Sequence, residues 1–159
     1  MNVFGGGSKM SMTVKPEVNL PGPVTLGVHQ PIILVADDEV MIRNLVTLLL
    51  QAQGYVVLSA FDGQEALDLS RKYPGTIDLV ITDVRMPRLD GIELCTRLLQ
   101  ERPGIKAIVM TGEEISEIVI QNINLPFLPK PFDGEALLAR VRASLSSVKP
   151  APGQGQLRR

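Results

Sequence analysis

Five short aliphatic runs, each followed by a segment with helical features, dominate the middle of this chain. A run without polar interruption is typical of a strand that is buried on both faces of a sheet. The runs that we expect to be strands are residues 32–36, 55–59, 77–82, 105–110 and 125–128. Because strand and helix alternate, the pattern predicts an α/β fold, with a parallel sheet that is covered by helices on both faces.

Helix signals lie between these runs. Asp62 with Glu65, and Asp90 with Glu93, have the spacing of a capping box at the start of a helix. Gly54 is expected to end the first helix. That helix should cover residues 40–52, with apolar side chains at helical spacing at Met41, Leu45, Leu48 and Leu49, and the last helix should cover residues 133–148.

One proline helps to order the predicted strands. Pro126 lies within the run 125–128, and proline cannot donate to a central ladder, so the fifth strand is expected at an edge of the sheet. The flavodoxin-like, doubly wound (βα)5 arrangement, with strand order 2-1-3-4-5, places it there. In such sheets ligands bind beyond the carboxyl ends of the strands.

The two ends of the chain differ in composition from its middle. Residues 1–30 and 148–159 are rich in glycine and proline and predict flexible arms, which leaves residues 31–147 as one folded domain. A formal net charge of −1 excludes the electrostatic footprint of a nucleic-acid-binding or polybasic membrane-binding protein. A single cysteine, Cys95, cannot form an intramolecular disulfide, and no stretch is long enough to span a bilayer. We therefore expect a cytoplasmic protein.

Polar residues follow the predicted strands at the point where each one ends. Asp37 and Asp38 follow the first strand, and Asp83 follows the third. Because these ends converge on one rim of the sheet, the three carboxylates should repel one another unless a cation is bound. Mg2+ suits such a site, since it binds carboxylate oxygens and keeps several waters.

A hydroxyl and an ammonium group are expected at the same rim. Thr111 ends the fourth strand and Lys130 follows the fifth. A lysine can neutralise a phosphoryl oxygen, a threonine can donate to another, and a carboxylate can act as the nucleophile that forms an aspartyl phosphate. Each residue alone has a plainer interpretation, such as a helix cap or a turn. Their joint placement at four strand ends favours a site for phosphoryl transfer.

Four segments carry a resemblance to a known family: ILVADDE, DLVITDVRMPRLDG, IVMTG and LPKPF. Together they resemble the receiver domains of bacterial two-component response regulators, over about residues 31–147. The resemblance implies that Asp83 is the phospho-acceptor. It also implies that Mg2+ is bound by Asp37, Asp38, Asp83 and the backbone carbonyl of Arg85. Thr111 and Lys130 would contact the phosphoryl group.

The resemblance implies further roles around the site. Lys130 and Pro131 would be joined by a cis peptide bond, and Gly112 would leave room for the phosphoryl group. Phe127 takes the position of the switch aromatic, which turns inward as Thr111 moves; the alternative is an ordinary apolar strand residue. Side chains at the positions of Arg85 and Glu113 influence the lifetime of the phosphoryl group in this family, and we expect the two charges to pair across the entrance and slow attack by water.

The chain departs from the family between Thr111 and Lys130, where it is shorter than usual. This segment is rich in β-branched residues, so the fourth helix, from Glu113, is expected to be short or irregular. That helix contributes to the usual output face, which puts in doubt how a partner reads the signal. His29 is interpreted as an incidental residue ahead of the first strand rather than a phosphoryl-relay histidine.

The function expected from this resemblance is signal transduction rather than enzyme catalysis. A sensor histidine kinase or phosphotransfer protein would phosphorylate Asp83, and the altered domain would bind a downstream protein, with homodimerisation as one form of output. Only a short tail follows residue 147, so the chain either acts through a partner or is a fragment of a larger regulator. Two alternatives are a pseudo-receiver that binds without phosphorylation and a haloacid-dehalogenase-type phosphatase. The phosphatase would usually carry a second aspartate at the position of Arg85.

Overall fold

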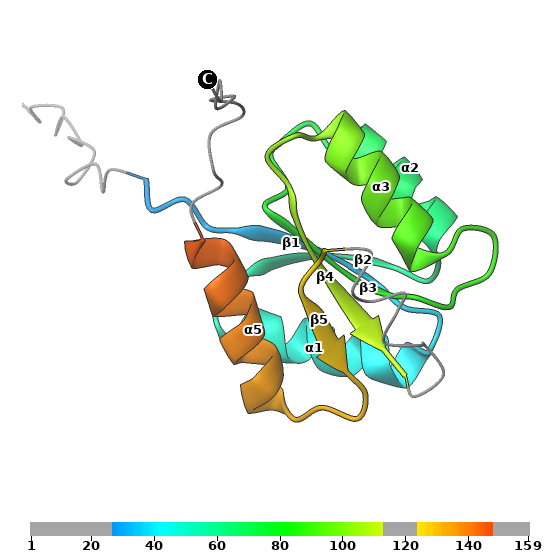
Figure 1. Ribbon diagram of the computed structural model, residues 1–159. Helices are drawn as coiled ribbons and strands as arrows, with labels where there is room; N and C mark the ends of the chain where they lie inside the picture. The colour runs from blue at the N-terminus through cyan, green and yellow to red at the C-terminus, as the bar shows by residue number, and fades with distance from the viewer. Residues whose placement is uncertain (1–26, 113–123, 148–159) are drawn as a thin grey trace, which may run out of the picture.

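Five parallel strands form one sheet in the computed structural model, which describes residues 27–112 and 124–147 (Figure 1). The strands are β1 (Ile32–Ala36), β2 (Val56–Ala60), β3 (Leu79–Asp83), β4 (Lys106–Thr111) and β5 (Phe127–Pro129), and the helices are α1 (Val40–Ala52), α2 (Gly63–Lys72), α3 (Gly91–Glu101) and α5 (Gly134–Ser146). Their order across the sheet is β2-β1-β3-β4-β5, with every neighbouring pair parallel. The predicted fold class and strand order are confirmed.

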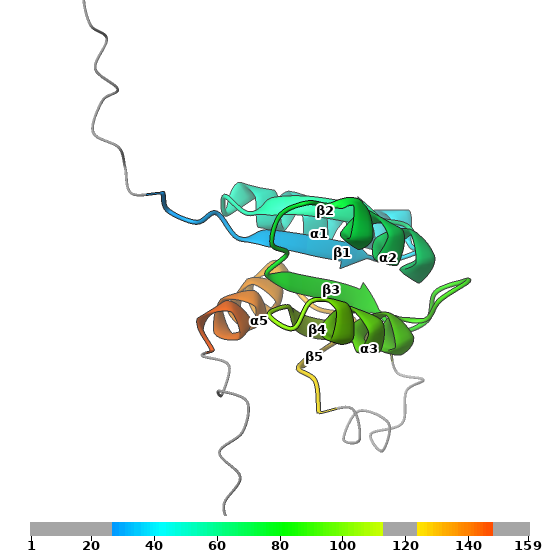
Figure 2. The same cartoon turned by 90° about the horizontal axis from the view of Figure 1, so that it is seen from above.

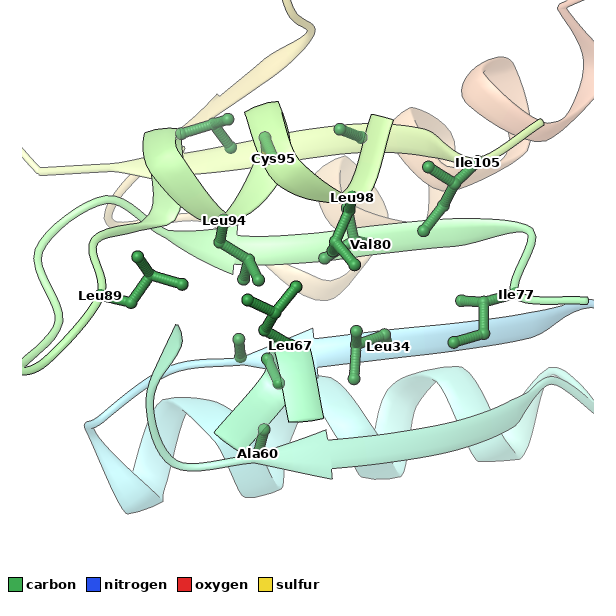
Figure 3. Packing of buried hydrophobic residues seen from close by; sticks show 14 residues of the cluster. Leu34, Ala60, Leu67, Ile77, Val80, Leu89, Leu94, Cys95, Leu98 and Ile105 are labelled. Carbon is green, nitrogen blue, oxygen red and sulfur yellow. The ribbon is translucent and has the colours of Figure 1, made fainter. Parts of the chain in front are cut away.

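The helices cover the sheet as two layers, with α1 and α5 on one face and α2 and α3 on the other (Figures 1 and 2). Alternate residues of the strands point to opposite faces, so Leu34 packs in the cluster under α2 and α3 while Ile33 and Val35 pack under α1 and α5. Figure 3 shows the first cluster, in which Leu67 of α2 and Leu94 of α3 lie over the strands. Fixed layers on both faces leave the strand ends as the open part of the domain.

The first cluster also contains the single cysteine. Cys95 is buried on α3, and this burial raises the pKa of its thiol to about 12. The thiol therefore stays protonated at neutral pH and acts as a small apolar side chain.

Helix α1 has the predicted bounds, but its apolar spacing does not mark the face that packs on the sheet. Met41, Leu45 and Leu48 are 77%, 46% and 65% exposed, whereas Val46 and Leu50 are fully buried. The helix is apolar on more than one side, so its periodicity alone cannot choose the inward face. The outward row of Met41, Leu45 and Leu48 is called the α1 stripe below.

The fifth strand lies at the predicted edge of the sheet, but the proline within it is not the one that the prediction used. Pro126 lies one residue before β5 rather than within it, and its carbonyl accepts a hydrogen bond from Val109 N–H at 2.9 Å. A different proline, Pro129, ends β5 and is tolerated because the strand lies at the edge.

Several expectations fall outside the described residues. These include the fourth helix, Glu113, residues 1–26 of the predicted N-terminal arm and residues 148–159 of the predicted tail. His29 belongs to the described part of the predicted arm, and its Nε2 lies 2.8 Å from an oxygen of Asp78. Asp78 directly precedes β3, so this contact lies at the opposite end of the strand from Asp83. Within the described ranges no helix is long and apolar enough to cross a membrane.

Arg102 joins the carboxyl ends of α2 and α3. Its guanidinium donates to the Ser70 hydroxyl at 2.9 Å, to the Gly75 carbonyl at 2.8 Å and to the Tyr73 carbonyl at 2.7 Å, and it also bonds the Ser70 carbonyl. One half-buried cation thus satisfies acceptors that the end of α2 leaves without helical partners.

We expect Arg102→Ala to lower the free energy of unfolding by about 2 kcal/mol, because these carbonyls lose a charged donor. Arg102→Lys should recover only part, since an ammonium group lacks the planar fork. Urea denaturation measures both. The matched control is Arg97→Ala, which removes an exposed pair with Glu93 on α3 and should cost about 0.5 kcal/mol. Equal losses in the two alanine variants would contradict the assignment.

Candidate functional site

The strand ends bring the predicted site residues to one rim of the sheet. Asp37 directly follows β1 and Asp83 ends β3, and the pairing of Ala36 with Thr82 sets these two ends side by side. One carboxylate oxygen from each of Asp37, Asp38 and Asp83 lies within 4.8 Å of the others. Thr111 ends β4 and pairs with Pro129, so Lys130 leaves β5 at the same rim.

Lys130 lies between two of these carboxylates. Its Nζ is 3.1 Å from Asp37 Oδ2 and 3.2 Å from Asp83 Oδ1, with Glu39 Oε1 further away at 3.8 Å. The backbone N–H of Lys130 donates to the Thr111 carbonyl at 2.6 Å, and the peptide bond to Pro131 is cis. The ammonium group therefore joins β5 to the ends of β1 and β3.

The three aspartates differ in exposure. Asp37 is buried completely, Asp83 is buried with 8% of its surface exposed, and Asp38 is exposed. A pocket of about 250 Å³ opens beside them, lined by Asp38, Glu39, Asp83, Val84, Arg85, Gly112 and Lys130. Asp83 is thus the buried carboxylate that faces open space, whereas Asp37 lies behind it.

Arg43 supports the acidic segment and was not anticipated from the sequence. Its guanidinium, on α1, donates to the backbone carbonyl of Asp37 at 2.7 Å, while Asp37 Oδ1 accepts from the backbone N–H of Glu39 at 2.8 Å. The available signal was the one charged side chain in the helix, one turn after the acidic residues. These bonds fix the turn between β1 and α1.

Burial and like charge make the site electrostatically unfavourable by itself. Burial raises the pKa of Asp37 and of Asp83. The charge of Lys130 acts against this, but both pKa values stay above the ordinary range. The charge of Asp37 also raises the pKa of Asp83. For Lys130, burial lowers the pKa, but the adjacent carboxylates more than offset this and the pKa is raised. Two of the three clustered carboxylates, Asp37 and Asp83, contact the one lysine, and the all-oxygen donor set of the cluster fits a hard divalent cation.

Phe127 and Thr111 lie on the same face of the sheet. Phe127 pairs with Val109, two residues before Thr111 on β4, and side chains two apart on a strand share a face. Phe127 is 40% exposed and Thr111 is buried.

Arg85 lines the pocket, while Glu113 lies outside the described residues, so their predicted pairing stays a prediction.

We expect Asp37→Asn to raise the thermal unfolding midpoint at neutral pH in a buffer without divalent cations. A carboxyl whose folded pKa is raised binds its proton more tightly in the native state, so its contribution to stability falls as pH rises above the ordinary value of 3.8. The gain should shrink as the pH is lowered toward about 4. Asp38→Asn, at the exposed neighbour, is the control and should change the midpoint less. A gain that grows on acidification would contradict this assignment.

The sequence matches a known protein family and its curated members. Residues 33–142 match the model of the response regulator receiver domain. The chain is 39% identical over 127 residues to the response regulator MprA of Mycolicibacterium vanbaalenii, an alignment that covers 78% of this chain and 54% of that protein. The chain thus spans about half the length of the curated relatives it matches.

Solved structures agree with the sequence relatives. The chemotaxis protein CheY4 of Vibrio cholerae superposes with a TM-score of 0.64 and 31% identity, covering 73% of this chain and 99% of that one. The signal receiver domain of an HD domain-containing protein from Pseudomonas fluorescens gives a TM-score of 0.66 and 31% identity, covering 73% and 94%. With the family model matching most of the described domain, the chain belongs to the response regulator receiver domain family.

Proposed function

We propose that residues 31–147 form a cytoplasmic, phosphoryl-accepting receiver, in which Asp83 takes the phosphoryl group of a phosphohistidine on a sensor kinase or phosphotransfer protein. The observation that carries the proposal is the position of Lys130 Nζ, within 3.2 Å of both Asp37 and Asp83, beside a cluster of three carboxylates. A cation that is held against the acceptor carboxylate can neutralise charge on an incoming phosphoryl group.

Exposure favours Asp83 over its neighbours as the acceptor. Asp37 is fully buried and does not line the pocket beside the cluster. Asp83 lines the open pocket, as a nucleophile must, while Asp38 is exposed beside it. We therefore assign the covalent step to Asp83, which also takes part in the metal site, and assign Asp37 and Asp38 to the metal alone.

The transfer step exchanges one covalent bond for another. A carboxylate oxygen of Asp83 attacks phosphorus, an O–P bond forms and the P–N bond of the donor breaks. The donor ring carries a proton on its other nitrogen before transfer, so it leaves as neutral imidazole with that proton in place. Lys130 pairs with one phosphoryl oxygen, and the Thr111 hydroxyl donates to another. Mg2+, held by Asp37, Asp38, Asp83 and the Arg85 carbonyl, would neutralise charge on the transferring group.

Space for the phosphoryl group is available where the site opens. Gly112 lines the pocket, and a Cβ added there would meet no atom of the described residues beyond its chain neighbours within 4 Å. The new charge then biases the position of Thr111, and through it Phe127 on the same sheet face. The output is the binding of a downstream protein, with homodimerisation as one form of it.

The wild-type chain should bind beryllofluoride in the presence of Mg2+, and Asp83→Asn should abolish this binding. Fluorine NMR detects the bound analogue. Phosphoryl incorporation from acetyl phosphate should fall by at least about a hundredfold in the same variant, since the nucleophile is lost. Asp68→Asn, on α2, is the matched control and should behave as wild type. A wild-type chain that binds no analogue would favour the pseudo-receiver alternative.

The α1 stripe offers a surface on which a donor protein can dock. Of the eight large apolar side chains exposed in the described ranges, four belong to α1, and the helix begins two residues after Asp38. A donor must bring its imidazole to Asp83, so its surface has to cover the rim where α1 starts. We therefore propose that Met41, Leu45 and Leu48 contact the phosphohistidine-bearing partner.

Leu45→Glu and Leu48→Glu should each lower kcat/KM for phosphotransfer from the partner by about tenfold or more, because a charge would be buried against an apolar surface. Glutamate keeps good helix propensity, so the fold is retained. Phosphorylation by acetyl phosphate, which needs no docking, should stay unchanged. Gln51→Glu adds the same charge to an exposed position of α1 and serves as the control. Loss of both activities would argue against a docking role.

A further inference from the structure

The loop between β3 and α3 determines where two groups of the proposed site lie. It runs from Val84 to Asp90 and carries Arg85, whose carbonyl is a proposed metal ligand. At its base, Gly91 N–H donates to the Val84 carbonyl at 2.9 Å, and a Cβ on Gly91 would overlap the carbonyl oxygen of Asp83. The loop therefore begins and ends against the backbone of the acceptor residue.

The far part of this loop lies against the amino end of α2. Leu89 is buried in the cluster under α2 and α3, as Figure 3 shows, and its carbonyl oxygen would overlap a Cβ on Gly63, the first residue of α2. The rest of α2 is anchored in the same core through Ala66 and Leu67. The amino end of α2 is thus a fixed support for the loop.

Arg88 makes an ion pair across this contact. Its Nε lies 2.6 Å from Asp62 Oδ2, and its guanidinium lies over the ring of Phe61 at 5.4 Å from the ring centre. Asp62 is only 1% exposed, and its other oxygen caps α2 by accepting from Glu65 N–H at 2.8 Å. A buried carboxylate needs a compensating cation, and Arg88 supplies it while its own side chain stays about half exposed.

The backbone of Arg88 adds a second observation. Its φ is 68°, in the left-handed region, which costs a residue other than glycine about 1 kcal/mol. Glycine would adopt this conformation with less strain, but it would leave Asp62 without its cation. The side-chain contact is therefore what the arginine contributes at this position.

We propose that Arg88 is a positioning residue for the proposed phosphoryl-transfer site. Its ion pair with Asp62 holds the 84–90 loop against α2, and so fixes the Arg85 carbonyl, three residues away, relative to the Asp37–Asp38–Asp83 cluster. This inference rests on the proposed function, because it assigns to Arg88 an effect on Mg2+ binding. A ligand that is already in place loses less conformational freedom when the ion binds, so affinity is higher.

A second ion pair provides a matched control. Arg71 and Glu101 join the same two helices, α2 and α3, at the end away from the site, with Arg71 Nε 3.0 Å from Glu101 Oε2. Breaking this pair loosens the contact between the helices and leaves the loop untouched. It separates a general effect on packing from an effect on the position of the loop.

The test measures the Kd of Mg2+ alone by titration calorimetry in the full chain. Arg88→Gly relieves the backbone strain and removes the ion pair, and Asp62→Asn keeps the helix cap and removes the charge. Each should raise the Kd by about tenfold, as loss of an outer-shell contact does. The double variant should be no worse than either single variant, since both remove one interaction. Arg88→Lys should restore part of the affinity, and Arg71→Ala should leave it unchanged.

The outcomes separate failure of the positioning role of Arg88 from failure of the proposed acceptor site. If the wild-type chain binds Mg2+ and both Arg88→Gly and Asp62→Asn keep its Kd, the positioning role is overturned and the acceptor site stands. An equal rise in Arg71→Ala would also overturn it, because the effect would then be general loosening. A wild-type chain that does not bind Mg2+ would overturn the proposed function and this inference with it. Urea denaturation confirms that each variant is folded, so that a change in Kd reports on the site.

Discussion

Two buried carboxylates that share one lysine are the interaction on which the rest of this structure depends. Asp37 and Asp83 are held together by the register of β1 against β3, and burial keeps their pKa values raised even with Lys130 beside them. The domain tolerates this because the two aliphatic layers stabilise the sheet from both faces. The repulsion between the two carboxylates is therefore sensitive to nearby charge. An added cation would weaken it, and a group that draws Lys130 away would strengthen it.

Much of the fold could be predicted from the sequence, because its signals are local. The aliphatic runs mark strands buried on both faces, and β1 and α1 have the expected bounds. The acidic and polar residues that end the runs were expected at one rim, and the topology of a parallel sheet brings them there. Asp62 caps α2 as expected, whereas the Glu65 carboxylate accepts from Phe61 N–H, one residue before the cap.

Features that depend on contacts distant in sequence could not be predicted in the same way. The inward face of α1 is one, because a helix with apolar residues on several sides can pack on any of them. Arg102 and Arg88 are others, since their acceptors lie 26 to 32 positions away in the chain and nothing local marks them. The edge position of β5 was inferred from Pro126, whereas the proline within the strand is Pro129. In each case the tertiary partner determines the outcome, and the local pattern does not identify that partner.

The contact between Lys130 and Asp37 joins residues 93 positions apart, and this separation has a consequence for synthesis of the protein. β5 is the last strand among the described residues, so Asp37 and Asp83 can be brought together by β1 and β3 before the lysine is available. During that interval the emerging domain holds two repelling acids at its rim. Addition of β5 to the sheet therefore also brings in the lysine that offsets this repulsion, which couples the electrostatics of the rim to completion of the sheet.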